Sequence, residues 1–135
     1  QARQNMANLR WLEERIMRIM SDFEITNFIF LDTTFPTLVN WSIHKSFSNF
    51  FIRVSEYESS EHAKKFIEKV EWIWLDCFSM NPASPSLVKE LNQHFKICLV
   101  SPELHGASQE KIAEFLSLKP LCHAVCTKHE ELWNS

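Results

Sequence analysis

The stretch Glu71-Trp72-Ile73-Trp74-Leu75-Asp76-Cys77-Phe78 decides the fold class of this chain. It is a short run of aromatic and β-branched residues that turns polar at a carboxylate, a composition typical of a parallel strand buried on both faces. Four other stretches have the same form, apolar until polar residues close them. They cover residues 28–32, 50–56, 96–101 and 123–128. The sequence therefore predicts five parallel strands.

Amphipathic segments separate these predicted strands. In residues 5–20, apolar side chains recur every three or four positions between charged ones, which predicts a helix that covers a sheet. Further helices are predicted after Ser59 or Ser60 and after Ser84, where a capping hydroxyl begins the helical pattern. Strands that alternate with helices pair in parallel through right-handed crossovers, so we expect an α/β fold built from βα units.

Two architectures fit such units. The first is part of a (β/α)8 barrel of the TIM type, which needs about 250 residues when complete. The second is an open, five-stranded, flavodoxin-like doubly wound sheet. The 135 residues form a single domain by size. We favour the barrel, in which residues 1–135 would be the carboxyl-terminal part of a larger structure.

Charge and hydropathy disfavour two classes of partner. Fourteen basic against 17 acidic residues give a net charge of -3, and no basic run is longer than Lys64-Lys65. A nucleic-acid surface is therefore not expected. No apolar run approaches the roughly 20 residues that a membrane span requires, so we expect a cytoplasmic protein.

Two residue types limit the chemistry further. The single glycine, Gly106, is too few for a Walker loop, a dinucleotide-binding fingerprint or a nucleophile elbow. Most of the cysteines fall on predicted strands, where buried free thiols are common, and a disulfide scaffold is not expected. Cys122, Cys126 and His129 lack the second ligand pair of a structural zinc site.

The carboxyl ends of the predicted strands carry the candidate site, because ligands bind there in both architectures. Several carboxylates and cations on one rim could hold a divalent metal, Mg²⁺ or Ca²⁺, and a phosphate beside it. The candidate catalytic residues are Glu56, Asp76, Glu103 and Lys128; the candidate substrate-binding residues are Arg53, Ser101 and His105; the candidate metal ligands are Glu56 and Asp76.

Structural roles compete with these assignments. A carboxylate such as Glu56 also favours the positive end of a following helix. Arg53, inside an otherwise apolar strand, needs an anionic partner, which could be a phosphate or the carboxylate of Asp32 or Asp76.

The stretch Ala124-Val125-Cys126-Thr127-Lys128-His129-Glu130-Glu131-Leu132-Trp133 resembles the closing strand of glycerophosphodiester phosphodiesterase-like (PI-PLC-like) TIM barrels. That family ends in a hydrophobic strand, then threonine and aspartate, an aromatic residue, a proline and a short helix. Thr127 and Leu132 fit this pattern, whereas Lys128 stands in place of the aspartate and no proline follows. Residues 53–58 and 99–106 are similar to rim loops of such barrels.

This resemblance implies metal-dependent hydrolysis of a glycerophosphodiester-type substrate by a complete barrel. The signature histidines and acidic ligands of the family lie in its amino-terminal part, and no such motif is found here. This chain would then supply rim groups and be inactive alone. A barrel divided in this way exposes two sheet edges, so self-association is expected.

Two other functions stay open. Asp76, Ser101 and Lys128 end successive strands in the way that the phospho-acceptor, hydroxyl and lysine do in receiver-like signalling domains, although Asp32 alone stands where receivers have an acidic pair. The missing motifs are also compatible with a scaffold that has no active site.

Overall fold

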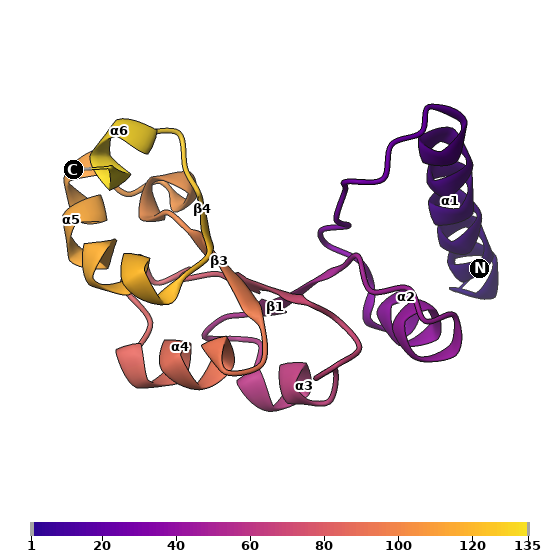
Figure 1. The fold of residues 1–135 in the computed structure, drawn as a ribbon, viewed down its shortest axis with the longest axis horizontal. Helices are drawn as coiled ribbons and strands as arrows, with labels where there is room; N and C mark the ends of the chain where they lie inside the picture. The colour runs from indigo at the N-terminus through magenta and orange to yellow at the C-terminus, as the bar shows by residue number, and fades with distance from the viewer. Residues whose placement is uncertain (1, 135) are drawn as a thin grey trace.

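A computed structural model describes residues 2–134 of the chain, with side chains from Leu12 onward. A four-stranded sheet lies at its centre (Figure 1). The strand order is β1-β2-β3-β4, and every neighbouring pair is parallel. The strands are β1 (Phe51–Val54), β2 (Trp72–Leu75), β3 (Lys96–Val100) and β4 (Ala124–Cys126). The expected α/β class with parallel βα units is therefore confirmed.

Helices precede, connect and follow the strands. They are α1 (Ala2–Asp22), α2 (Phe35–Val39), the π-helix η1 (Asn40–His44), α3 (Ser60–Lys64), α4 (Pro85–Asn92), the 3-10 helices η2 (Pro102–His105) and η3 (Gln109–Lys111), α5 (Ile112–Phe115), the 3-10 helix η4 (Leu116–Leu121) and α6 (Glu130–Trp133). The predicted caps are confirmed: Ser59 accepts a hydrogen bond from the amide of Glu61, and Ser84 accepts one from the amide of Leu87.

The prediction of a strand over residues 28–32 is wrong, because this segment forms only one isolated bridge to the sheet. Phe30 pairs in parallel with Phe50, and its amide donates to the carbonyl of Asn49 at 2.8 Å. The chain then leaves the sheet at Asp32, whose φ of 57° lies in the left-handed region that aspartate tolerates better than most residues. Phe30 still places this segment beside β1, at the edge of the sheet.

The two faces of the sheet differ in cover. The residues on one face are buried against the helices and form the core, among them Ile52, Ile73, Leu75, Ile97 and Leu99. α3 and α4 lie on this side (Figure 1). Consecutive parallel strands joined by right-handed crossovers place their helices on one face, which accounts for the asymmetry.

The opposite face of β1 and β2 is only half buried. Its side chains include Phe51, Trp72 and Trp74, and the ring of Phe51 lies 5.8 Å from Trp72 and 5.2 Å from Trp74. The prediction that the central strand is buried on both faces is therefore wrong for β2. We call the half-buried set Phe51, Trp72 and Trp74 the open aromatic face.

The strand order bears on the two expected architectures. A flavodoxin-like sheet has a reversal in its strand order, whereas the observed order follows the chain without one. That alternative does not agree with the topology. The strands that the structure describes form an open sheet, so what is established is a parallel α/β sheet and not a closed barrel. None of the helices within residues 2–134 has the length and apolar character to cross a membrane.

Candidate functional site

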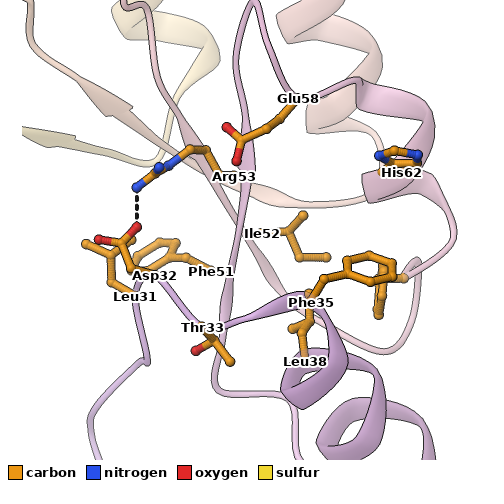
Figure 2. Close-up of a pocket in the computed structure, with 11 residues that line it drawn as sticks. Leu31, Asp32, Thr33, Phe35, Leu38, Phe51, Ile52, Arg53, Glu58 and His62 are labelled. Carbon is orange, nitrogen blue, oxygen red and sulfur yellow. Dashed lines mark hydrogen bonds and ion pairs between the residues drawn. The ribbon is translucent and has the colours of Figure 1, made fainter. Parts of the chain in front are cut away.

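A cavity of about 450 Å³ lies next to β1, where the chain diverges after the Phe30 bridge (Figure 2). Leu38, Ile52 and Phe66 form its apolar side, and Asp32, Arg53 and Glu58 provide charged groups. Arg53 connects this cavity with a network of polar contacts at the carboxyl ends of the strands.

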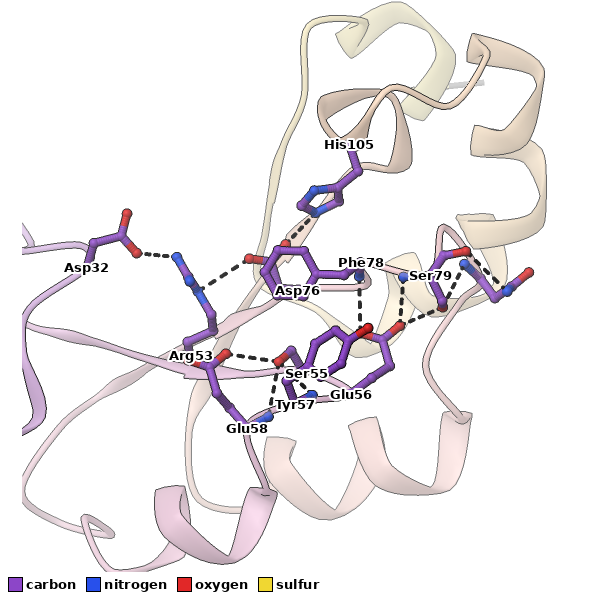
Figure 3. A network of polar contacts seen from close by, with 11 residues as sticks. Asp32, Arg53, Ser55, Glu56, Tyr57, Glu58, Asp76, Phe78, Ser79 and His105 are labelled. Carbon is purple, nitrogen blue, oxygen red and sulfur yellow. Dashed lines mark hydrogen bonds and ion pairs between the residues drawn. The ribbon is translucent and has the colours of Figure 1, made fainter.

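Arg53 and Asp76 meet because β1 and β2 are in register (Figure 3). Asp76 directly follows β2, its amide donates to the carbonyl of Val54, and only 4% of its side chain is exposed. The Nε atom of Arg53 lies 3.3 Å from Oδ2 of Asp76. This Nε is buried and makes no hydrogen bond, so the contact is an ion pair without hydrogen-bond geometry.

The outer end of the same guanidinium pairs with Asp32. The side chain of Asp32 is 65% exposed, in contrast to that of Asp76. Of the two carboxylates, Asp32 is therefore the one that an incoming anion could displace without opening the sheet. Asp32 and Asp76 were the two carboxylates expected as partners of Arg53, and the structure contains both contacts.

His105 completes the cluster from the other side of Asp76. Its Nε2 lies 2.5 Å from Oδ1 of Asp76, and its ring contacts Phe78 with centroids 4.9 Å apart. His105 ends η2, and Gly106 follows with a φ of 91°, which favours glycine. The described residues offer no hydrogen-bond partner to the other ring nitrogen, Nδ1. A carboxylate-oriented imidazole with one free nitrogen is suited to proton transfer.

Glu56 is engaged in the loop after β2 and not in this cluster. It accepts hydrogen bonds from the amides of Phe78 and Ser79, each at 3.1 Å, and from the Ser79 hydroxyl at 2.6 Å. Partial desolvation raises the pKa of Glu56, but these hydrogen bonds outweigh it and hold the pKa below its ordinary value. Glu56 thus stabilises the loop that carries Phe78.

The geometry gives no support to a metal site at Glu56 and Asp76. Both oxygens of Glu56 already accept hydrogen bonds, and the two oxygens of Asp76 face His105 and Arg53. In the part of the chain that the structure describes, no group of three or more histidine, cysteine, aspartate or glutamate residues could hold a metal ion.

Glu103 joins the ends of β3 and β4. It accepts hydrogen bonds from the hydroxyls of Ser101 and Thr127 and from the amide of Lys128, the last at 3.0 Å. Desolvation raises the pKa of Glu103, but the hydroxyl and amide donors outweigh it and lower the pKa overall. Ser101 is fully buried and also accepts a hydrogen bond from Trp133.

The structure therefore divides the seven predicted site residues into groups. Arg53, Asp76 and His105 come together in one cluster. Ser101, Glu56 and Glu103 form hydrogen bonds in the interior or in the loops. The ammonium group of Lys128 makes no hydrogen bond or ion pair with the described residues, whereas its amide donates to Glu103. Phe78 was not among the predicted site residues, yet it lies against both His105 and Arg53; its position two residues after Asp76 was the available signal.

Comparison with known proteins adds no relative: no family model, curated protein or solved structure matches this chain. The functional interpretation therefore depends on the geometry of the Arg53–Asp76–His105 cluster and of the sheet that carries it.

Proposed function

We propose that this chain forms the carboxyl-terminal part of a phosphodiesterase-type (β/α)8 barrel and that its rim binds a small phosphodiester. Arg53 would bind the phosphate and His105 would transfer a proton. The observation that carries the proposal is that one buried carboxylate, Asp76, contacts Nε of Arg53 at 3.3 Å and Nε2 of His105 at 2.5 Å.

The sheet supports the barrel part of the proposal. Its strands are parallel and follow the chain order, as strands of a (β/α)8 barrel do. Helices cover one face, and bulky side chains fill the other, which would be the barrel interior. The open aromatic face would then meet further strands, from a second copy of this chain or from another chain. Self-association is the form of this proposal that is simplest to test.

The chemistry follows from the roles that the three side chains can perform. A guanidinium binds phosphate oxygens with directional hydrogen bonds, and the exposed Asp32 is the partner that a phosphate would displace. Asp76 accepts from the Nε2–H of His105 and so orients the imidazole with its free Nδ1 as an acceptor. Nδ1 could take a proton from the water that attacks phosphorus, and the imidazolium could return that proton to the leaving oxygen as its bond to phosphorus breaks. Both groups lie at the carboxyl ends of strands, where barrel enzymes bind substrates.

A divalent metal does not fit the residues first expected to hold it. Glu56 uses its oxygens for the loop after β2, and Asp76 uses its oxygens for Arg53 and His105. The proposal therefore contains no step that involves a metal.

The receiver-like alternative has less support from the geometry. Phosphorylation of Asp76 needs a free carboxylate oxygen, and both oxygens are engaged, one with Arg53 and one with His105, at a side chain with 4% exposure. The Ser101 hydroxyl, its expected neighbour in that alternative, is directed to Glu103 and Trp133.

Binding of a phosphodiester tests the proposal without requiring turnover. Dimethyl phosphate titrated into the protein should bind, and Arg53→Gln should weaken that binding at least about tenfold. Arg18→Gln, at an exposed position of α1, is the matched control and should leave the affinity unchanged. Absence of binding to the unmodified chain at both low and high protein concentration would contradict the proposal.

Hydrolysis provides the second measurement, at concentrations where the chain associates. If bis(p-nitrophenyl) phosphate is cleaved, His105→Gln should lower the rate about 100-fold, as expected for the loss of a general acid or base. His94→Gln, an exposed histidine at the end of the α4 region, is the control.

A further inference from the structure

The cavity beside β1 exists because two neighbouring segments separate (Figure 2). Phe30 pairs with Phe50, but Leu31 and Asp32 leave the edge of β1 and continue into α2. A space of about 450 Å³ opens between the segments. This volume lies in the range of roughly 300–1,000 Å³ that small-molecule sites occupy.

The cavity has an apolar side that would hold a hydrophobic group. Leu38, Ile52 and Phe66 are buried side chains that contribute to it. The ring of Phe35 meets that of Phe66 edge-on with centroids 5.8 Å apart, yet 55% of Phe35 is exposed. A ligand in the cavity would cover an aromatic ring that the chain itself leaves in water.

The charged groups of the cavity favour a cation. Asp32 and Glu58 contribute two carboxylates, Arg53 contributes one guanidinium, and His62 contributes an imidazole. That guanidinium is already paired with Asp32 and with Asp76, the second of which lies outside the cavity lining. One oxygen of Glu58 accepts a hydrogen bond from the Ser55 hydroxyl at 2.9 Å, and its other oxygen has no hydrogen-bond partner among the described residues.

We propose that this cavity binds an organic ammonium ion attached to an aromatic or branched apolar group. The ammonium would lie next to the carboxylates of Asp32 and Glu58, and the apolar group would pack on Phe35 and Phe66. An ammonium near an aromatic ring also gains from the negative face of the ring. This site shares Asp32 and Arg53 with the proposed phosphodiester rim, but it does not use His105 and depends on no turnover.

The experiment compares three ligands of similar shape and different charge. Phenethylammonium, 2-phenylethanol and phenylacetate are titrated into the full chain at neutral pH, with affinities from calorimetry or chemical-shift changes. We expect the ammonium to bind about tenfold more tightly than the alcohol, and the carboxylate to bind more weakly than both.

Variants then locate the site. Glu58→Gln should weaken phenethylammonium binding about fivefold or more and leave 2-phenylethanol unchanged, because only the cation loses its partner. Asp32→Asn serves as a second variant if Glu58→Gln lowers the stability. Glu61→Gln removes an exposed carboxylate of α3 that lies outside the cavity lining, and it should change neither affinity.

Each other outcome would overturn the inference. Equal affinity for the ammonium and the alcohol would mean that the cavity selects only apolar groups. Tightest binding of phenylacetate would mean that Arg53 dominates the field of the cavity. No binding of any of the three, or equal effects of Glu58→Gln and Glu61→Gln, would show that no such site exists here. None of these results depends on whether dimethyl phosphate binds at the rim.

Discussion

Asp76 contacts His105, 29 residues further along the chain, with Nε2 of the imidazole 2.5 Å from Oδ1 of the carboxylate. The other oxygen of Asp76 faces Arg53 on the neighbouring strand. One buried carboxylate therefore joins β1, β2 and the helix that follows β3. Because its two partners are cationic or can become so, Asp76 should matter both for stability and for the position of the proposed catalytic groups.

Asp76→Asn tests this relationship. An amide cannot form an ion pair with Arg53 or His105, and it leaves a partly buried guanidinium with a weaker partner. We expect the free energy of unfolding to fall by about 2 kcal/mol, measured by urea denaturation. The control is Asp32→Asn, whose exposed pair with Arg53 should contribute less than about 1 kcal/mol. Equal losses in the two variants would contradict a central role for Asp76.

The lowered pKa of Glu103 should make the stability of the folded chain depend on pH. Its pKa is lowered in the folded chain, where the Ser101 and Thr127 hydroxyls and the Lys128 amide outweigh desolvation. A lowered folded pKa means that the stabilisation is present above the unfolded value of about 4.3 and is lost as the pH falls through the folded pKa.

Glu103→Gln should therefore be less stable than the unmodified chain at neutral pH and approach it in stability under acid conditions. Denaturation curves at several pH values measure this difference. Glu24→Gln, an exposed residue after α1, should show no such difference at any pH. A stability gap for Glu103→Gln that persists below the folded pKa would show that the carboxylate charge is not the cause.

Periodicity and composition were sufficient to predict most of the sheet. Four of the five predicted strands form, because apolar runs between amphipathic helices have few alternatives to parallel pairing. The segment at residues 28–32 has the same composition but makes one bridge only. The segment leaves the sheet at Asp32, where the backbone φ is positive. An apolar pattern does not reveal a positive φ at a residue other than glycine.

The candidate site was predictable in position but not in pairing. Arg53, Asp76 and His105, which form the cluster, were all among the predicted site residues, since a parallel sheet places the strand ends on one edge. Which carboxylate faces Arg53 and which one accepts loop amides depends on side-chain directions after the strand ends. Asp76 and Glu56 have the same chemistry in the sequence, yet the first is buried between two partners and the second holds the loop at Ser79.

Three of the four cysteines should react slowly in the folded chain. Burial raises the pKa of Cys77 to about 11, of Cys98 to about 12 and of Cys122 to about 11. Since the thiolate is the nucleophile, these thiols should react far more slowly with a disulfide reagent at neutral pH in the folded than in the unfolded state. Reaction time courses with and without denaturant measure this. Rapid modification of Cys98 in the folded chain would contradict its burial.

The open aromatic face predicts self-association. Trp74 is a half-buried residue of this face. Its ring lies against that of Phe51, and its backbone is paired with Cys98 of β3. If a second copy covers this face, Trp74→Ser should weaken the association at least about tenfold in sedimentation velocity, because large aromatic side chains dominate interface energies. Tyr57→Ser, at an exposed aromatic residue that is not part of the open aromatic face, is the control. A monomer at all concentrations, or an equal effect of Tyr57→Ser, would contradict this prediction.

Ser101 and Trp133 form a buried hydrogen bond that fixes the end of the chain. The indole Nε1 donates to the Ser101 hydroxyl at 2.9 Å, and both residues are buried. Ser101→Ala leaves the indole donor without an acceptor, at an expected loss of about 1–3 kcal/mol in the free energy of unfolding. Trp133→Phe also removes the donor, so the double variant should lose less than the sum of the single losses. A coupling energy of about 1 kcal/mol in this double-mutant cycle is the expected result. Additive losses would show that the hydrogen bond contributes nothing beyond the packing of the two side chains.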